Sequence, residues 1–164
     1  MRKLLTLLMF VMAIGIANAT ENTGRVKIGV GLLYENGLDI TVGYETEGAN
    51  HNIWEFFASG YIKWTECESC GHVCPESFWK NYRTWCVGAA YKPCVKRGRN
   101  NYGNLRMGGS LGADTHEIVG GVHLGYEHSY VLRSGFQLFW GVKTDLIING
   151  RDLFRTGAVL GIKF

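Results

Sequence analysis

The sequence has 164 residues, a formal net charge of +3, 23 glycines, 13% aromatic residues and only two prolines. This length fits a single domain, and the near balance of charge gives no electrostatic basis for direct binding of nucleic acid. Abundant glycines and aromatic residues in short alternating segments indicate a curved β-sheet rather than a helical domain.

The first 19 residues have the pattern of a signal peptide. Arg2 and Lys3 precede an apolar run over 4–16, and Ala17-Asn-Ala supplies a small-x-small cleavage site. The run is shorter than the roughly 20 residues that a spanning helix requires, so we expect cleavage rather than an uncleaved anchor. Cleavage removes two basic residues, lowers the net charge to +1 and leaves one domain at 20–164.

Alternation of apolar with small or charged residues begins at Val26 and runs to Leu33. The pattern resumes over 38–45 after Asn36-Gly37, a dipeptide typical of tight hairpins, and again over 54–64. Further alternating segments cover 84–91, 105–112, 122–127, 136–143 and 157–164. We therefore predict about eight antiparallel strands, an even number.

The last strand has the clearest pattern. Its apolar face consists of Ala158, Leu160, Ile162 and Phe164, and its other face is small or charged. A strand that ends on an aromatic residue is typical of a barrel wall in lipid. We expect this strand to close the barrel and to be the segment that the barrel-assembly machinery recognises.

The two faces of the strands predict what lies inside and outside. With the apolar face turned to outer-membrane lipid, aromatic residues such as Trp54 and Trp140 form girdles, and the glycine-rich polar face lines the lumen. The predicted luminal polar residues are Lys27, Asp39, Glu45, Glu55, Lys63, Arg106, Glu127, Lys143 and Lys163. The alternative is a secreted soluble β-sandwich or calycin-like barrel with the apolar faces buried. The terminal aromatic residue and the glycines favour a single up-and-down transmembrane β-barrel in the outer membrane of a Gram-negative bacterium.

A barrel with its amino terminus in the periplasm places alternate links on opposite sides of the membrane. The short links near Gly48, at 96–98 and at 132–134 are then periplasmic, and the long link at about 66–79 is extracellular. Basic residues near the second of these links predict a periplasmic patch, or simply a solvated turn beside the membrane. They are Lys92, Lys96, Arg97 and Arg99.

The long link carries Cys67, Cys70 and Cys74 with His72 between them. A disulfide among these cysteines suits an oxidising compartment, and we expect one, with its connectivity open. A zinc site is the alternative, although this crowded cluster lacks the second ligand pair of a structural zinc site; a loop with neither also stays open. Cys86 falls on the luminal face of its strand, and Cys94 lies at the opposite end of that strand from the loop.

A serine-hydrolase interpretation rests on His123, Glu127 and Ser129. His123 and Glu127 share the luminal face but lie four residues apart, roughly 13 Å along a strand, which is beyond hydrogen-bonding reach. We therefore expect these residues to fill a polar lumen, and we predict no catalytic residues, no cofactor and no metal site.

The segment from Asn52-Ile-Trp54-Glu55 to the ending Asp152-Leu-Phe-Arg-Thr-Gly-Ala-Val-Leu-Gly-Ile-Lys-Phe164 resembles the conjugative-transposon TraO family. Members of that family are exported proteins of similar size encoded in the transfer operons of mobile elements. The likeness covers about two thirds of the chain, and the cysteine-rich loop departs from it.

The resemblance implies a non-catalytic scaffold or assembly factor in the outer-membrane part of a conjugation apparatus, with other envelope transfer proteins as partners. An eight-stranded barrel has room only for its own side chains, so it cannot be the conduit for DNA. A stand-alone barrel for adhesion or envelope stability is the alternative. A barrel enzyme that acts on lipid through His123, Glu127 or Ser129 is a third hypothesis.

Overall fold

The computed structural model describes residues 23–34, 36–64, 71, 82–114, 117–150 and 152–164. The predicted signal peptide and Cys67, Cys70 and Cys74 lie outside the described residues. Nine strands and one short 3-10 turn, η1 (Ala49–His51), form the described fold. The strands are β1 (Thr23–Leu33), β2 (Gly37–Glu47), β3 (Ile53–Lys63), β4 (Tyr82–Lys92), β5 (Cys94–Arg97), β6 (Asn101–Asp114), β7 (Ile118–Val131), β8 (Gln137–Ile148) and β9 (Phe154–Lys163). Within this part of the chain, no helix combines the length and the apolar composition of a membrane-spanning helix.

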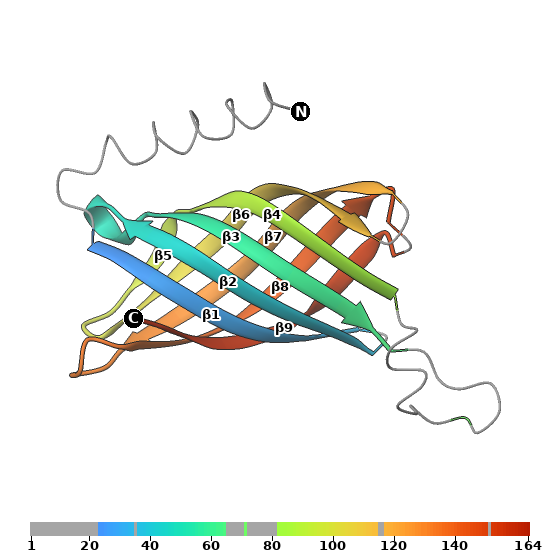
Figure 1. The fold of residues 1–164 in the computed structure, drawn as a ribbon. Coiled ribbons are helices and arrows are strands. Elements are labelled where there is room, and N and C mark those ends of the chain that lie inside the picture. The colour runs from blue at the N-terminus through green and yellow to red at the C-terminus, as the bar shows by residue number, and fades with distance from the viewer. Residues whose placement is uncertain (1–22, 35, 65–70, 72–81, 115–116, 151) are drawn as a thin grey trace.

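The strands form one closed antiparallel barrel (Figure 1). β1 pairs with both β2 and β9, and β4 pairs with β6, so the sheet returns on itself. β4 and β5 are successive parts of one wall element, because both pair with β6 and only Pro93 separates them. Proline has no backbone N–H and cannot continue the hydrogen-bond ladder, which explains the interruption. The nine strands therefore fill eight positions around the barrel, which confirms the prediction of an eight-stranded up-and-down barrel.

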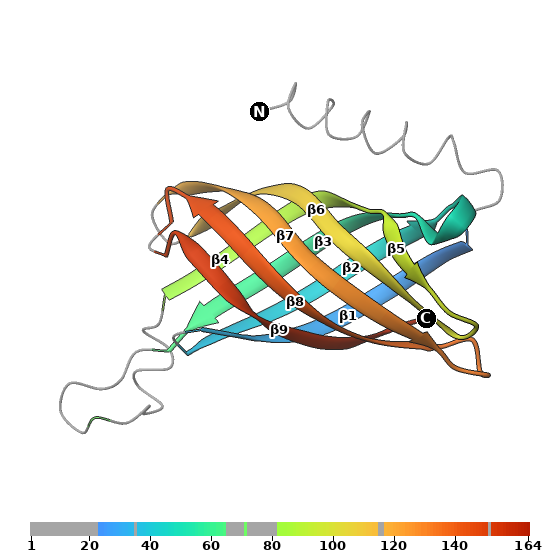
Figure 2. The ribbon, with the colours of Figure 1, turned by 180° about the vertical axis from the view of Figure 1, so that it is seen from behind.

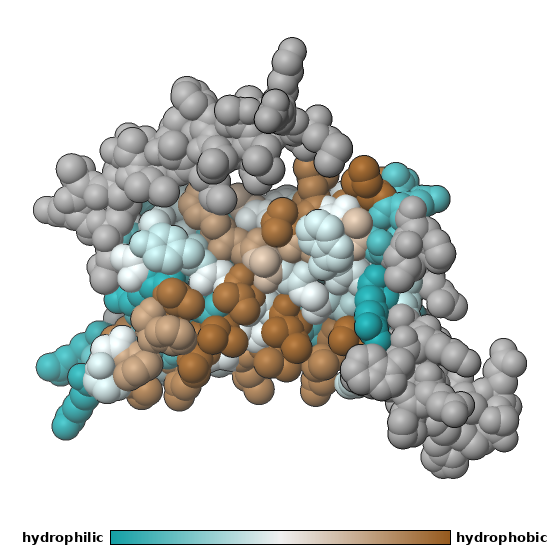
Figure 3. Space-filling model, viewed as in Figure 1, coloured by the Kyte–Doolittle hydropathy of each residue, from teal (hydrophilic) through white to brown (hydrophobic). Residues whose placement is uncertain are grey.

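Apolar side chains face outward along every long strand. On β1, Val26, Ile28, Val30 and Leu32 are exposed, whereas Lys27 on the opposite face is only 4% exposed. Apolar residues form a band across the middle of the barrel wall, with hydrophilic residues at its two ends (Figure 3). A soluble sandwich has the reverse arrangement, so this outer surface requires lipid around it.

Glycines allow close approach at the seam between β1 and β9. A Cβ atom at Gly161 would lie 2.1 Å from the backbone oxygen of Ile28, and one at Gly157 would lie 2.1 Å from that of Leu32. The register pairs Lys27 with Lys163 and Leu33 with Gly157, so the seam joins the first and last strands along most of their length.

The two ends of the barrel differ in their connections. The turns at 48–52, 98–100 and 132–136 lie at one end, together with the start of β1 and Phe164 (Figures 1 and 2). We call this the terminal end, and the opposite end, where β3 finishes and β4 begins, the loop end. The short links that were predicted to share one side of the membrane do lie together at the terminal end.

Candidate functional site: a charged lumen

Polar side chains from all around the barrel meet in the lumen. Of the nine residues predicted to be luminal, eight are buried and Lys63 is half-buried. They belong to seven of the eight wall elements, all except the one formed by β4 and β5, because each strand turns every second residue inward. Charged groups buried at this density require partners, and the structure pairs them in layers along the barrel axis.

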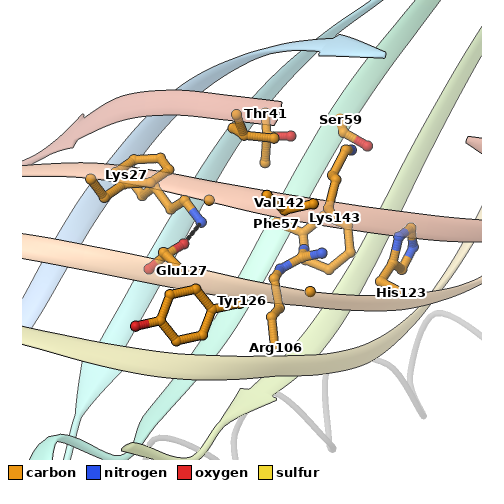
Figure 4. A pocket seen from close by; sticks show the side chains of 14 residues that line it. Lys27, Thr41, Phe57, Ser59, Arg106, His123, Tyr126, Glu127, Val142 and Lys143 are labelled. Atoms are coloured by element: carbon orange, nitrogen blue, oxygen red, sulfur yellow. Dashed lines mark hydrogen bonds and ion pairs between the residues drawn. The ribbon is translucent and has the colours of Figure 1, made fainter. Parts of the chain in front are cut away.

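The largest layer, the central charge cluster, consists of Lys27, Glu45, Glu55, Lys92, Arg106, Glu127 and Lys163. Each of the seven residues comes from a different strand. Glu127 is at its centre: Nζ of Lys27 and of Lys163 each lie 2.5 Å from its carboxylate, and Nζ of Lys92 lies 3.0 Å away. Figure 4 shows Lys27 and Glu127 pointing toward each other across the lumen.

Two further carboxylates belong to the same cluster. Glu45 contacts Lys92 and also Lys163, whose Nζ lies 2.8 Å away. Glu55 accepts hydrogen bonds from Nε of Arg106 at 2.7 Å and from Nζ of Lys27 at 3.0 Å. The cluster therefore ties β1, β2, β3, β4, β6, β7 and β9 together through the barrel interior.

A second layer lies nearer the loop end. Lys143 Nζ lies 2.9 Å from Asp39 and 2.8 Å from Asp145. Asp145 in turn lies 2.7 Å from Nδ1 of His123, and Nε2 of that histidine lies 2.7 Å from Oγ of Ser110. Across the two layers five cations face five carboxylates, so the buried formal charge balances when His123 is neutral.

Each mouth of the barrel has its own contacts. At the loop end, the guanidinium of Arg155 lies 4.0 Å from the ring centre of Tyr61, and Lys63 pairs with Asp152 at 2.9 Å. At the terminal end, Glu47 contacts both Arg25 and His51. The lumen thus contains paired side chains from one mouth to the other.

Sequence reasoning missed several members of these layers. Lys92, Asp145 and Arg155 were not among the predicted luminal residues, although each continues the inward-facing register of a predicted strand by one or two steps. The prediction that Lys92 belongs to a periplasmic basic patch is wrong. Its side chain is fully buried in the central charge cluster, because β4 extends one inward position beyond the predicted strand end.

The structure brings His123 together with Ser110 and Asp145, and not with Ser129 or Glu127. The order serine, histidine, aspartate is that of a hydrolytic triad, and both links have hydrogen-bond length. Ser110 and His123 are buried, however, and the luminal cavity beside His123 has a volume of about 30 Å³. Such a space holds about one or two water molecules. Ser110 also lines a cavity of about 640 Å³ formed by β3, β4, β6 and β7, but among the described residues no other polar side chain lines that cavity, so no side chain there can stabilise a developing oxyanion. We interpret the three residues as part of the polar filling of the lumen.

The two cysteines within the described residues occupy separate places. Cys86 faces the lumen, where its Sγ lies 3.0 Å from Oγ of Ser59. Cys94 begins β5 at the terminal end, and its Sγ donates to the backbone oxygen of Lys96 at 3.3 Å. Their positions agree with those expected from the strand pattern.

Comparison with solved structures gives several matches that extend over most of the chain. Neisserial surface protein A matches with a TM-score of 0.60 and 12% sequence identity, over 85% of this chain and 92% of that one. The chain has the fold of an outer-membrane β-barrel. A major outer membrane protein of Thermus thermophilus matches this barrel with a TM-score of 0.55 and 10% identity, over 88% and 98% of the two chains. Ail of Yersinia pestis matches with a TM-score of 0.52 and 10% identity, over 87% and 100%.

No protein-family model matches the sequence, and no curated protein matches it either. The solved structures share the outer-membrane barrel's fold at low sequence identity, so the likeness concerns architecture alone. The location of the barrel follows independently from its apolar outer wall, since closed barrels with such walls reside in outer membranes.

Proposed function

We propose that this protein is a non-conducting, non-catalytic structural component of the outer membrane that acts through its two ends. The observation that carries the proposal is the central charge cluster, in which seven side chains from seven strands meet across the lumen. Its carboxylates and cations contact one another, and the cavity beside them has a volume of only about 30 Å³. A barrel filled in this way has only its wall, its turns and its mouths available to partners.

Conductance of the purified barrel in a planar bilayer tests this proposal. We expect no discrete conductance steps from the wild-type protein at moderate voltage. The comparison variant is Glu127→Ala, which removes the carboxylate that three lysines share. Of the substitutions in the central charge cluster, this one is expected to favour ion passage through the lumen most. A stable, ion-selective current through the wild-type barrel would contradict the proposal, because the paired charges would then have to separate in the native state.

We propose further that the barrel serves a conjugative transfer apparatus as a scaffold or assembly factor. The support is the resemblance of the C-terminal segment to the TraO family, and the expected partners are other envelope transfer proteins. Deletion of the gene from a donor strain should lower the mating frequency, and the wild-type gene should restore it. Affinity purification of the barrel from donor envelopes should recover transfer proteins.

A stand-alone role in adhesion or envelope stability is the second candidate. It is favoured by the filled lumen together with the fold-level likeness to small outer-membrane barrels, neither of which requires a transfer apparatus. This role predicts a binding or detergent-sensitivity phenotype in cells that carry no mobile element. Unchanged mating by the deletion strain, together with such a phenotype, would decide for this second role.

We also infer that the barrel-assembly machinery recognises β9. Ala158, Leu160, Ile162 and Phe164 all face outward on this strand, and the ring of Phe164 packs 6.3 Å from that of Phe136. Phe164→Ala should slow insertion into membranes that contain the assembly machinery, measured as the rate at which the compact, heat-sensitive band appears on a gel. Equal slowing in pure lipid vesicles would assign the effect to intrinsic folding instead.

A further inference from the structure

Exposed cations gather at the terminal end of the barrel. Lys96 in β5, Arg99 in the following turn and Arg133 in the β7–β8 turn are all exposed. The two hairpins that carry them are neighbours, because Asn101 pairs with Tyr130 and the amide of Val131 donates to the oxygen of Asn100 at 2.8 Å (Figure 2). These three cations form what we call the terminal basic cluster.

The acidic side chain nearest to this end is already engaged. Glu47 contacts Arg25 and His51, and among the described residues no ion pair joins a carboxylate side chain to the terminal basic cluster. Arg97 differs from the three cations, since its guanidinium donates to the side-chain oxygen of Asn50 at 3.1 Å and to the backbone oxygen at 2.8 Å. Arg97 therefore has a structural contact with η1.

Apolar residues lie directly beside the terminal basic cluster on the outer wall. Val95, next to Lys96, is 54% exposed, and Leu132, next to Arg133, is 42% exposed. Phe136 and Phe164 are exposed at the same end. Cations that border an apolar wall lie at the depth of the lipid headgroups, with the hydrocarbon beginning below them.

A groove runs along the outer wall from the headgroup level toward the middle of the barrel. It has a volume of about 420 Å³ and is lined by Tyr130, Leu138, Trp140, Leu160 and Ile162, from β7, β8 and β9. Tyr130 pairs with Leu138 at the base of the hairpin that carries Arg133. The groove therefore begins at the base of the hairpin that carries Arg133.

The pairing of neighbouring strands also relates Lys96, in β5, to the position of this groove. Lys96 pairs with Gly103, and Gly103 pairs with His128. The ring of His128 lies 5.8 Å from that of Trp140, which lines the groove. Lys96 therefore lies at the same level along the barrel as Trp140, three strands away from it, and Arg133 lies in the hairpin next to the groove.

We propose that this face binds an anionic glycerophospholipid, with an acyl chain in the groove and the phosphate among Lys96, Arg99 and Arg133. Guanidinium and ammonium groups donate to phosphate oxygens, and a lipid with net negative charge is favoured over a zwitterionic one by each cation near it. The leaflet concerned is the phospholipid leaflet that faces the periplasm, a choice that rests on the orientation expected from the sequence, in which the terminal end is periplasmic.

Quenching of Trp140 by brominated lipids tests the proposal. The full barrel is reconstituted in phosphatidylcholine vesicles that contain a small fraction of brominated phosphatidylglycerol or brominated phosphatidylcholine. The difference in quenching between wild type and Trp140→Phe isolates the signal of this tryptophan. We expect stronger quenching by the brominated anionic lipid at low salt, and an apparent affinity that falls roughly fivefold for each cation removed.

The triple variant K96Q/R99Q/R133Q should lose the preference for phosphatidylglycerol while keeping the heat-dependent gel shift of a folded barrel. The matched pair is Arg99→Gln and Arg97→Gln, which each remove one positive charge. Because the Arg97 side chain is held by Asn50, Arg97→Gln should lower the preference less than Arg99→Gln does. Equal quenching by the two lipids in wild type, or a preference that survives in the triple variant, would overturn the proposal. Stronger competition by lipopolysaccharide than by phosphatidylglycerol would also overturn it.

Discussion

Glu127 contacts three lysines from three different strands, so its carboxylate contributes to three sides of the lumen at once. Replacing one partner of a buried ion pair leaves uncompensated charge and costs about 3–5 kcal/mol. Glu127→Gln should therefore lower the free energy of unfolding by about that amount, measured by urea unfolding in lipid vesicles. Glu117→Gln changes an exposed side chain at the loop end and should stay within about 0.5 kcal/mol. A loss below about 1 kcal/mol for Glu127→Gln would mean that water already separates these charges.

Ser110 offers a second test at the scale of single residues. If the Ser110, His123 and Asp145 chain only fills the lumen, a fluorophosphonate probe should leave the folded barrel unlabelled, because the hydroxyl is buried. Ser110→Ala should cost about 1–3 kcal/mol of stability, since it leaves a ring nitrogen of His123 without its partner. Labelling of the wild-type barrel that Ser110→Ala abolishes would revive the hydrolase interpretation.

At the scale of elements, the β1–β9 seam depends on glycine. A methyl group at Gly161 would lie 2.1 Å from the oxygen of Ile28 and would push the two strands apart. Gly161→Ala should therefore lower the free energy of unfolding by about 1–3 kcal/mol and reduce the yield of the compact band on unheated gels. Gly60→Ala, in β3, is the matched control because no atom lies within 4 Å of its added methyl group. Equal effects of the two substitutions would show that the seam tolerates the extra atom.

The sequence allowed the wall elements to be predicted, because an alternating pattern states directly which residues share a face. The alternating pattern did not predict that Pro93 divides one wall element into β4 and β5. Both parts pair with β6, and the pattern along one strand does not show its pairing partner. Lys92 and Asp145 each lie one inward-facing position beyond the last inward residue of the predicted strands, so extending the same alternation by two residues would have found them. Strand ends are set by the turns and not by the pattern, so the alternation alone does not show how far each strand continues.

Contacts across the whole molecule could not be predicted in the same way. Asp145 lies directly opposite His123 in the β7–β8 register, but Ser110 lies opposite Gly121, two residues along from His123. The diagonal contact of Ser110 with His123 exists because Gly121 has no side chain: a Cβ there would lie 2.8 Å from the serine oxygen. Such a contact requires the register of neighbouring strands, which alternation along a single strand does not provide.

The pairing of Lys27 with Lys163 also affects the order in which the parts of the barrel fold. Until β9 pairs with β1, the first strand has no neighbour on one side. The ammonium group of Lys27 also needs Glu55 and Glu127 as partners, which lie 28 and 100 residues further along the chain. Contacts this distant in sequence form slowly, because a long loop must close before they contribute any stability. Closure of the barrel therefore comes late in folding, and the central charge cluster is complete only when β9 brings Lys163 to Glu45 and Glu127.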